Sequence, residues 1–321
     1  MQCRDNPWTR KLIHTMNAKT FKSDFILLIV ASIWGLAFVA QRMGMDHVGP
    51  YTFNGIRFAL GGLSLTPFLL AAHKKRKQKK ILPADPSAKE ILISGAAAGA
   101  VLFAGASLQQ IGLVYTSAGK AGFITGLYVV IVPFLGIFFK EKTGAKTGTG
   151  TWIGAVLAAT GLYFLSINRD MSVSFGDFLV FLCAFCFAVH VIMIGKLSAR
   201  IDTLRLSFVQ CMICSAASMT AAVFMEDISF DNIMQAAVPI FYGGVFSVGI
   251  AYSLQIYGQK GSHPAHAAIL MSLESVFAAL GGWLILGEIL SMRAFGGCAL
   301  MMSGMLVSQL YAYIHPKAAQ L

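Results

Sequence analysis

Residues 107 to 122 read SLQQIGLVYTSAGKAG, and residues 253 to 268 read SLQIYGQKGSHPAHAA. At an offset of 146, the two stretches share identical residues: Ser107, Leu108, Gln109, Gly112 and Ala121 fall on Ser253, Leu254, Gln255, Gly258 and Ala267. Elsewhere, SDF at 23–25 aligns with GDF at 176–178, and Gly154 and Gly161 align with Gly297 and Gly304. Because these matches keep one order, they predict a chain built from two related halves.

The composition indicates that both halves lie in a membrane. Of the 321 residues, 56% are hydrophobic and 12% are charged, whereas soluble proteins average roughly 25% charged residues. The mean hydropathy is +0.69. A net charge of +11 would suggest nucleic acid if the basic residues formed one face, but they stand in short clusters between apolar runs. We therefore expect a membrane protein with lipid around it and no nucleic-acid partner.

A membrane-spanning helix needs about 20 mostly apolar residues. Ten segments meet this requirement, at 24 to 43, 51 to 72, 91 to 114, 119 to 139, 149 to 168, 175 to 195, 204 to 225, 234 to 257, 265 to 286 and 293 to 314. The first segment lacks a small-residue cleavage pattern, so we expect a retained span and not a signal peptide. The predicted fold class is an all-α membrane protein with ten transmembrane helices.

The distribution of basic residues predicts the orientation. Lysine and arginine in short loops favour the cytoplasmic face. If the N-terminus is cytoplasmic, the cytoplasmic segments hold all but five of the 25 lysines and arginines, and those five are Arg42, Arg57, Lys120, Arg169 and Arg293. Nine or eleven spans would break this alternation. We expect a multi-pass protein of the cell inner (plasma) membrane with both termini in the cytoplasm.

Five spans in each half mean that the second half enters the membrane from the opposite side. The expected organisation is a cytoplasmic tail at 1–21, a first five-helix repeat at 22–168, a second at 169–316 and a C-terminal tail at 317–321. Inverted repeats allow two exchangeable conformations around a substrate site near the midplane. This favours a transporter. A channel or non-transporting membrane sensor is the alternative, followed by an integral-membrane enzyme.

Five segments carry a resemblance to a known family: SIWGLAF (32–38), PYTFNGIR (50–57), YTSAGKAGFITGLYVVIVP (115–133), GDFLVFLCAFCFA (176–188) and SLESVFAALGGWLILGE (272–288). In this order, over about residues 22 to 314, the chain resembles the EamA-type branch of the drug/metabolite transporter superfamily. The resemblance implies two inverted five-helix repeats, a central cavity, and export or exchange of a small metabolite, amino acid or drug. It names no substrate.

Glu274 is the acidic residue that lies deepest in a predicted span, whereas Asp24 and Asp177 are expected in first helical turns. A carboxylate at this depth marks a functional path, or else is a structural group bonded to a neighbouring span. Arg57 is expected at a depth that differs by only about 4 Å. We predict that the two line one cavity and either pair or bind a zwitterionic substrate. The alternative for Arg57 is a side chain that extends outward to the interface.

Further polar and aromatic residues suit a cavity wall: Trp34, Gln109, Tyr128, Tyr252 and Gln255. Hydrogen bonds between helices would explain them as well. Glu274 aligns with Tyr128, and Phe187 stands where the first half has Trp34, so the two halves of the wall are not chemically equivalent. Lys120 follows a tight turn and is expected either to hold a carboxyl group at the cavity mouth or to extend to the interface.

No metal site or cofactor is predicted. The C-x-x-C pairs at 183–186 and 211–214 have metal-ligand spacing, but they lie inside apolar spans without other ligands, so we interpret them as packing residues. His263 and His266 suit capping better than metal binding, and His190 suits a structural hydrogen bond better than a proton relay.

We expect a secondary active transporter that works by alternating access, and proton antiport follows if Glu274 titrates. No ATP-binding motif is present in the sequence. The small residues of GTWIG at 150–154 let helices approach closely and leave a homodimer open as an alternative to packing within the chain.

Overall fold

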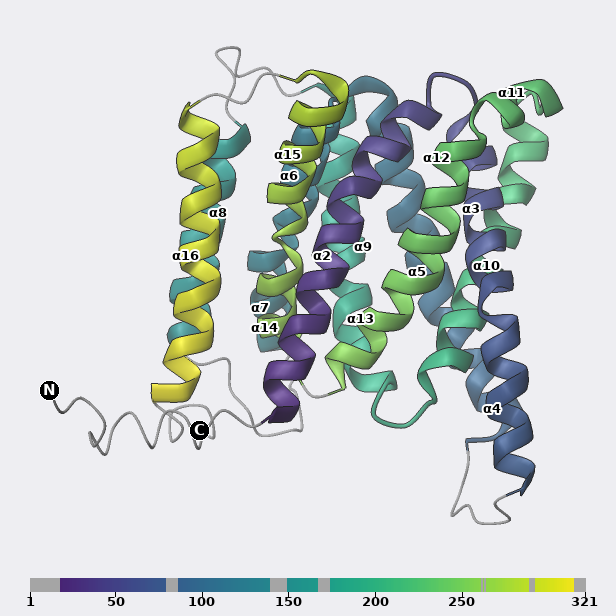
Figure 1. The fold of residues 1–321 in the computed structure, drawn as a ribbon, viewed down its shortest axis with the longest axis horizontal. Helices are drawn as coiled ribbons and strands as arrows, with labels where there is room; N and C mark the ends of the chain where they lie inside the picture. The colour runs from purple at the N-terminus through teal and green to yellow at the C-terminus, as the bar shows by residue number, and fades with distance from the viewer. Residues whose placement is uncertain are drawn as a thin grey trace, which may run out of the picture.

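The structure is a computed structural model that describes residues 18–78, 86–138, 149–166, 174–260, 262, 264–288 and 292–314. Residues 1–17 of the predicted N-terminal tail, the C-terminal tail, the loop lysines of 140–146 and His263 lie outside these residues, whereas residues 18–21 of the predicted tail belong to a helix. Figure 1 shows a bundle of long helices that run between two faces. We call the face at which the first helix begins the lower face, and the face at which it ends the upper face.

The regular structure of the described residues is helical throughout. In chain order the elements are α2 (Ala18–Gly44), α3 (Pro50–Ser64), α4 (Thr66–Gln78), α5 (Ala88–Tyr115), α6 (Ala118–Gly126), α7 (Tyr128–Phe138), α8 (Thr149–Ser166), α9 (Phe175–Leu197), α10 (Thr203–Met225), α11 (Phe230–Gln235), α12 (Ala237–Phe241), η1 (Tyr242–Ala251), α13 (Tyr252–Gln259), α14 (Pro264–Met271), α15 (Glu274–Leu286) and α16 (Met292–Ile314). The helix α2 begins at Ala18, so Asp24 lies in its second turn and the first-turn prediction for this residue was wrong.

Eight helical stretches of the described residues are long and apolar enough to cross a membrane. Two further apolar stretches, Trp152–Gly161 in α8 and Phe295–Gly304 in α16, are shorter. The chain is thus an all-α, multi-pass membrane protein, and the count of ten spans stays a prediction.

Four of the predicted spans are interrupted helices. The fourth breaks at Leu127, between α6 and α7, where Leu127 N donates to Ile124 O at 3.2 Å and Val130 N to Leu127 O at 3.0 Å. The ninth breaks at Ser272–Leu273, between α14 and α15, with the corresponding bonds from Leu273 N to Leu270 O at 3.3 Å and from Val276 N to Leu273 O at 3.0 Å. These i→i+3 bonds tighten the helix for one turn.

The second and eighth spans are also interrupted. The second breaks at Leu65, between α3 and α4. The eighth contains a ten-residue π-helix, η1, between α12 and α13. Longer i→i+5 turns of this kind are rare and often occur at functional sites.

Helix contacts repeat between the two halves. The α5–α9 contact has a counterpart in α13–α2, the α10–α5 contact in η1–α3, and the α6/α7–α9 contact in α15–α2. Glycines allow the close approach in the first of these pairs. A Cβ atom at Gly112 would lie 2.8 Å from Gly176 O, and one at the aligned Gly258 would lie 3.4 Å from Ser23 O.

The helices α8 and α16 pack against each other through aligned glycines. A Cβ atom at Gly161 would lie 2.5 Å from Gly297 O, and one at Gly304 would lie 2.7 Å from Gly154 O. Tyr311 of α16 covers Gly150. The small-residue face of the fifth span is therefore occupied by a helix of the same chain, which favours the packing interpretation of GTWIG over a dimer contact.

Candidate functional site in the central cavity

A cavity lies among α2, α3, α5, α6, α7, α9, η1, α13 and α15, with about 490 Å³ of empty space including its opening. Its lining residues come from both halves: Trp34, Ala37, Phe38, Gln41, Arg57, Gln109, Thr125, Tyr128, Phe187, His190, Val191, Ser247, Tyr252, Gln255 and Glu274.

Seven of the eight predicted site residues line this cavity: Trp34, Arg57, Gln109, Tyr128, Tyr252, Gln255 and Glu274. The eighth, Lys120, does not; its Nζ lies 2.6 Å from Asp177 Oδ2 near the upper face. The tertiary structure thus gathers residues that are more than 200 positions apart in the sequence.

The sequence reasoning missed several lining residues. Phe187 could have been found, because it aligns with Trp34. Gln41 lies two helical turns beyond Trp34, and this spacing places both on one face of α2. Thr125 and Ser247 gave no signal, because a lone hydroxyl residue is common in membrane helices.

Glu274 is the first residue of α15, directly after the break in the ninth span. Its side chain is buried, with 4% of the residue exposed. The carboxylate oxygen Oε1 has no hydrogen-bonding partner among the described residues. Tyr128, the first residue of α7, lies beside the Glu274 carboxylate and interacts with it electrostatically. The contact does not have the geometry of a hydrogen bond, and the Tyr128 hydroxyl has no other partner in the described part of the chain.

Arg57 is buried on α3 with 3% of the residue exposed, so its side chain does not extend to the membrane interface. The guanidinium carbon lies 5.5 Å from the centre of the Phe53 ring and 5.1 Å from that of Phe58. These cation–π contacts favour the charged side chain at the cavity wall. No ion pair between Arg57 and Glu274 is present within the described residues.

Five lining residues have a buried polar atom without a partner among the described residues: Gln41 Oε1, Arg57 Nε, Tyr128 Oη, Gln255 Oε1 and Glu274 Oε1. Buried polar groups in native proteins are nearly always hydrogen-bonded, and leaving one unsatisfied costs about 1–3 kcal/mol. The cavity therefore offers both donors and acceptors to a polar solute or to water.

Other polar groups of the wall hold the helices together. Trp34 Nε1 donates to the carbonyl of Ser247 in the π-helix at 3.1 Å, and Gln109 Nε2 donates to Thr125 Oγ1 at 3.1 Å. His190 Nε2 lies 3.0 Å from Gln210 Oε1. His190 thus has the hydrogen bond that the sequence reasoning favoured, and it also lines the cavity.

Aromatic rings form the apolar part of the cavity wall. The ring centres of Trp34 and Tyr252 are 4.9 Å apart, and those of Phe58 and Tyr252 are 6.1 Å apart. The cysteines of the C-x-x-C pairs do not contribute to this wall. Cys183, Cys211 and Cys214 are buried in apolar clusters.

A buried cavity with unpaired charged groups in a multi-helix membrane bundle is the arrangement of a solute transporter. The chain belongs to the EamA-like transporter family, whose model matches residues 21–167 and again residues 174–309.

Curated relatives agree with this assignment. An uncharacterized transporter from Archaeoglobus fulgidus is 30% identical over 291 residues, which cover 90% of this chain and 87% of the relative. The uncharacterized inner membrane transporter YedA from Escherichia coli K12 is 24% identical over 295 residues, which cover 88% and 89% of the two chains. These names describe transporters and not enzymes.

A solved crystal structure of a protein superposes on this fold with a TM-score of 0.72 at 18% identity. The superposition covers 91% of this chain and 97% of the other. At this identity the match supports the fold alone.

Proposed function

We propose that the protein is a secondary active transporter that exports or exchanges a small metabolite, amino acid or drug from a site in the central cavity. One observation carries the proposal: a buried arginine, Arg57, and a buried glutamate, Glu274, line one cavity and both present unsatisfied polar atoms there. A structural ion pair would have satisfied the two side chains with each other. A solute with both charges satisfies them when it binds.

The preferred substrate class is a zwitterion of amino-acid size. The guanidinium of Arg57 suits a carboxylate, which it can bind through two parallel hydrogen bonds. The carboxylate of Glu274 suits an ammonium group. The aromatic side of the wall, with Trp34 and Tyr252, suits an apolar side chain.

Alternating access between two inverted five-helix repeats is the proposed mechanism. Its support is that the family model matches the chain twice, that helix contacts recur in both halves, and that the fourth and ninth spans break at the aligned residues Leu127 and Leu273. Interrupted helices near the midplane are a recurring feature of such binding sites.

Proton coupling through Glu274 is the proposed energy source. Protonation would neutralise the carboxylate in one conformation, and release would follow on the other side of the membrane. The proposed location is the cell inner membrane with the lower face in the cytoplasm. Support comes from the charge distribution and from the printed name of the Escherichia coli relative.

Counterflow in proteoliposomes tests the function. Purified protein is reconstituted with a high internal concentration of an unlabelled neutral amino acid, and uptake of the labelled form is followed across a panel. Transient accumulation above the external concentration is expected for at least one zwitterion and is absent for a channel. If the labelled amino acids moved only down their own concentration gradients, the result would support the channel alternative. Normal counterflow in both Arg57→Gln and Glu274→Gln would contradict the proposed site.

A further inference from the structure

Two ion pairs lie at opposite faces of the bundle, and each joins the first half of the chain to the second. Near the upper face, Lys120 Nζ of α6 lies 2.6 Å from Asp177 Oδ2 of α9. Near the lower face, His266 Nε2 of α14 lies 3.0 Å from Asp24 Oδ1 of α2. The two interactions therefore connect the halves on either side of the cavity.

The two pairs occupy equivalent positions in the repeat. Lys120 aligns with His266 at the same offset that aligns Gln109 with Gln255, and Asp177 aligns with Asp24 in the GDF and SDF triplets. Each pair is thus the counterpart of the other, with the roles of the two halves exchanged. If the two ion pairs had formed by chance, both residues of one pair would not be expected to align with both residues of the other.

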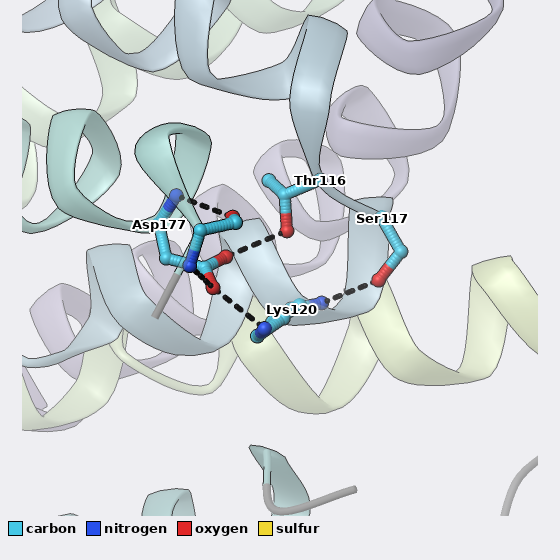
Figure 2. Close-up of polar contacts among 5 residues, drawn as sticks. Thr116, Ser117, Lys120 and Asp177 are labelled. Atoms are coloured by element: carbon cyan, nitrogen blue, oxygen red, sulfur yellow. Dashed lines mark hydrogen bonds and ion pairs between the residues drawn. The ribbon is translucent and has the colours of Figure 1, made fainter. Parts of the chain in front are cut away.

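The upper pair is held by a network that Figure 2 shows. Asp177 is 5% exposed, and its Oδ1 accepts a hydrogen bond from Thr116 Oγ1 at 2.9 Å. Its Oδ2 accepts from Ser174 N at 3.1 Å, and its own backbone N–H donates to Ser174 Oγ at 3.2 Å, which completes the capping box of α9. On the other side, Lys120 N donates to Ser117 Oγ at 3.2 Å at the start of α6. The pair ties the beginnings of two helices together.

The lower pair has fewer supports within the described residues. Asp24 is 8% exposed and lies inside α2, not at a cap. Two residues earlier in this helix, Lys22 Nζ donates to Tyr257 Oη of α13 at 3.3 Å. A histidine forms a full ion pair only when it is protonated and otherwise a hydrogen bond, whereas lysine carries its charge throughout the neutral range. The upper contact is the stronger of the two.

Each pair lies at the outer end of a half-helix that leads to the cavity. Lys120 precedes Tyr128 by eight residues, and His266 precedes Glu274 by eight residues, which is about 12 Å along a helix. The half-helix α6 ends at Gly126, just before Tyr128, and α14 ends at Met271, just before Glu274. A movement that separates α6 from α9 at the upper face, or α14 from α2 at the lower face, would displace the half-helix that leads to one of these two cavity residues.

We propose that Lys120–Asp177 and Asp24–His266 are the two gate contacts of the transporter, one for each face. The cavity opens to a face when that face's pair separates, while the opposite pair stays formed. Both pairs are formed in this structure, and on this proposal a full opening to either face requires the loss of the pair at that face. This inference rests on the proposed alternating access and assigns the residues that set the balance between its two open states.

Thiol labelling from each side of the membrane tests the gates. In a background without the six native cysteines, the aligned cavity residues Gln109, nearer the upper face, and Gln255, nearer the lower, are replaced one at a time as Gln109→Cys and Gln255→Cys. A membrane-impermeant maleimide is then applied to right-side-out and inside-out vesicles. Asp177→Asn should raise labelling of the Gln109→Cys probe from one side by roughly three- to tenfold, the effect expected for a partly buried ion pair. Asp24→Asn should do the same for the Gln255→Cys probe from the opposite side.

Matched variants separate a gate from a purely structural contact. Thr116→Val removes the hydrogen bond that an uncharged hydroxyl donates to the same Asp177 carboxylate but leaves the ion pair, so labelling should stay near that of the parent. Exchange of the charges in Lys120→Asp with Asp177→Lys should return labelling toward the parent. His266→Lys should reduce labelling of the Gln255→Cys probe, because it gives the lower face the stronger pair.

The proposal is overturned if Asp177→Asn leaves the labelling of both probes unchanged, or if it raises labelling equally from both sides, which would indicate general loosening of the bundle. All comparisons use equal amounts of monodisperse protein. The labelling requires no substrate, so a failed transport assay would contradict the proposed function without affecting this result. Symmetric labelling with intact counterflow would contradict the gates alone.

Discussion

Tyr128 and Glu274 occupy aligned positions in the two halves, and each is the first residue after a break in its span. Both line the central cavity, and both have a buried oxygen without a partner in the described residues. The fold therefore presents one phenol and one carboxylate at equivalent points of an otherwise similar framework. Because of this chemical difference, the cavity wall contributed by the first half is not equivalent to the wall contributed by the second half.

Removal of the Glu274 charge should separate exchange from net transport. In Glu274→Gln the shape is kept, so counterflow of a bound substrate should persist in part. Accumulation driven by an imposed proton gradient should fall at least about tenfold, because the carboxylate proposed to carry the proton is gone. Uptake with and without the gradient measures the ratio. Glu274→Asp serves as the control and should retain gradient dependence. Gradient-driven uptake by Glu274→Gln at the parent rate would contradict proton coupling at this residue.

Substitution of Arg57 should weaken binding of the substrate carboxylate. Arg57→Lys keeps the charge but loses the planar pair of donors, and Arg57→Gln loses the charge as well. The loss of a hydrogen bond to a charged group costs about 1.5–3 kcal/mol, so Kd for a zwitterion should rise by roughly ten- to a hundredfold in Arg57→Gln and by less in Arg57→Lys. Scintillation proximity binding measures this. The corresponding amine without a carboxylate is the control ligand, and its affinity should change little in the Arg57 variants. An equal loss of affinity for both ligands would show that Arg57 does not bind the substrate carboxylate.

Glu226 should stabilise the start of α3 independently of transport. Its carboxylate accepts from Tyr51 N at 2.7 Å, from Thr52 N at 2.8 Å and from Thr52 Oγ1 at 2.7 Å. Because helix N-termini leave backbone donors unsatisfied, Glu226→Ala should lower the free energy of unfolding by about 1–2 kcal/mol. Thermal melting in detergent measures the change. The exposed neighbour Asp227 supplies the control Asp227→Ala, and an equal Tm for both variants would contradict the capping role.

The contact between α8 and α16 should not tolerate a methyl group at Gly161. A Cβ atom there would lie 2.5 Å from Gly297 O, whereas a Cβ atom at Gly296 would meet nothing within 4 Å. Overpacking of this kind costs about 1–3 kcal/mol, so Gly161→Ala should lower Tm and Gly296→Ala should not, since alanine favours the helix. Measurement of both in the same detergent gives the comparison. A Tm for Gly161→Ala at or above that of Gly296→Ala would show that these helices are not in close contact.

Most of the cavity-lining residues that we predicted could be found from the sequence, because the signals are the chemical type of a residue and its position within one span. A buried charge such as Arg57 or Glu274 has few reasons to lie in an apolar span, and the aligned pair of Gln109 and Gln255 came directly from the repeat. The interruption of the eighth span by a π-helix was not predicted, because YGGVFSVGIA at 242–251 is as apolar as its neighbours. The composition of this segment does not indicate whether its backbone forms i→i+5 or i→i+4 hydrogen bonds.

Lys120 and His266 show where sequence reasoning stopped. Each was judged alone, one as a cavity-mouth cation and the other as a capping residue, although their alignment was present in the sequence. Their proposed common role as gate residues depends on Asp177 and Asp24, which the tertiary structure brings to them from the other half of the chain.

The sequence by itself determined the membrane class and predicted two related halves and the charged residues of the cavity, because long apolar runs, repeated triplets and isolated buried charges are readable along one chain. Only the tertiary structure decided which side chains satisfy one another. Hydrogen bonds and ion pairs depend on distances of about 3 Å between helices that are far apart in sequence, and packing sets those distances. Within the described residues it left Arg57 and Glu274 without an ion pair to each other, and it joined Lys120 to Asp177 and Asp24 to His266.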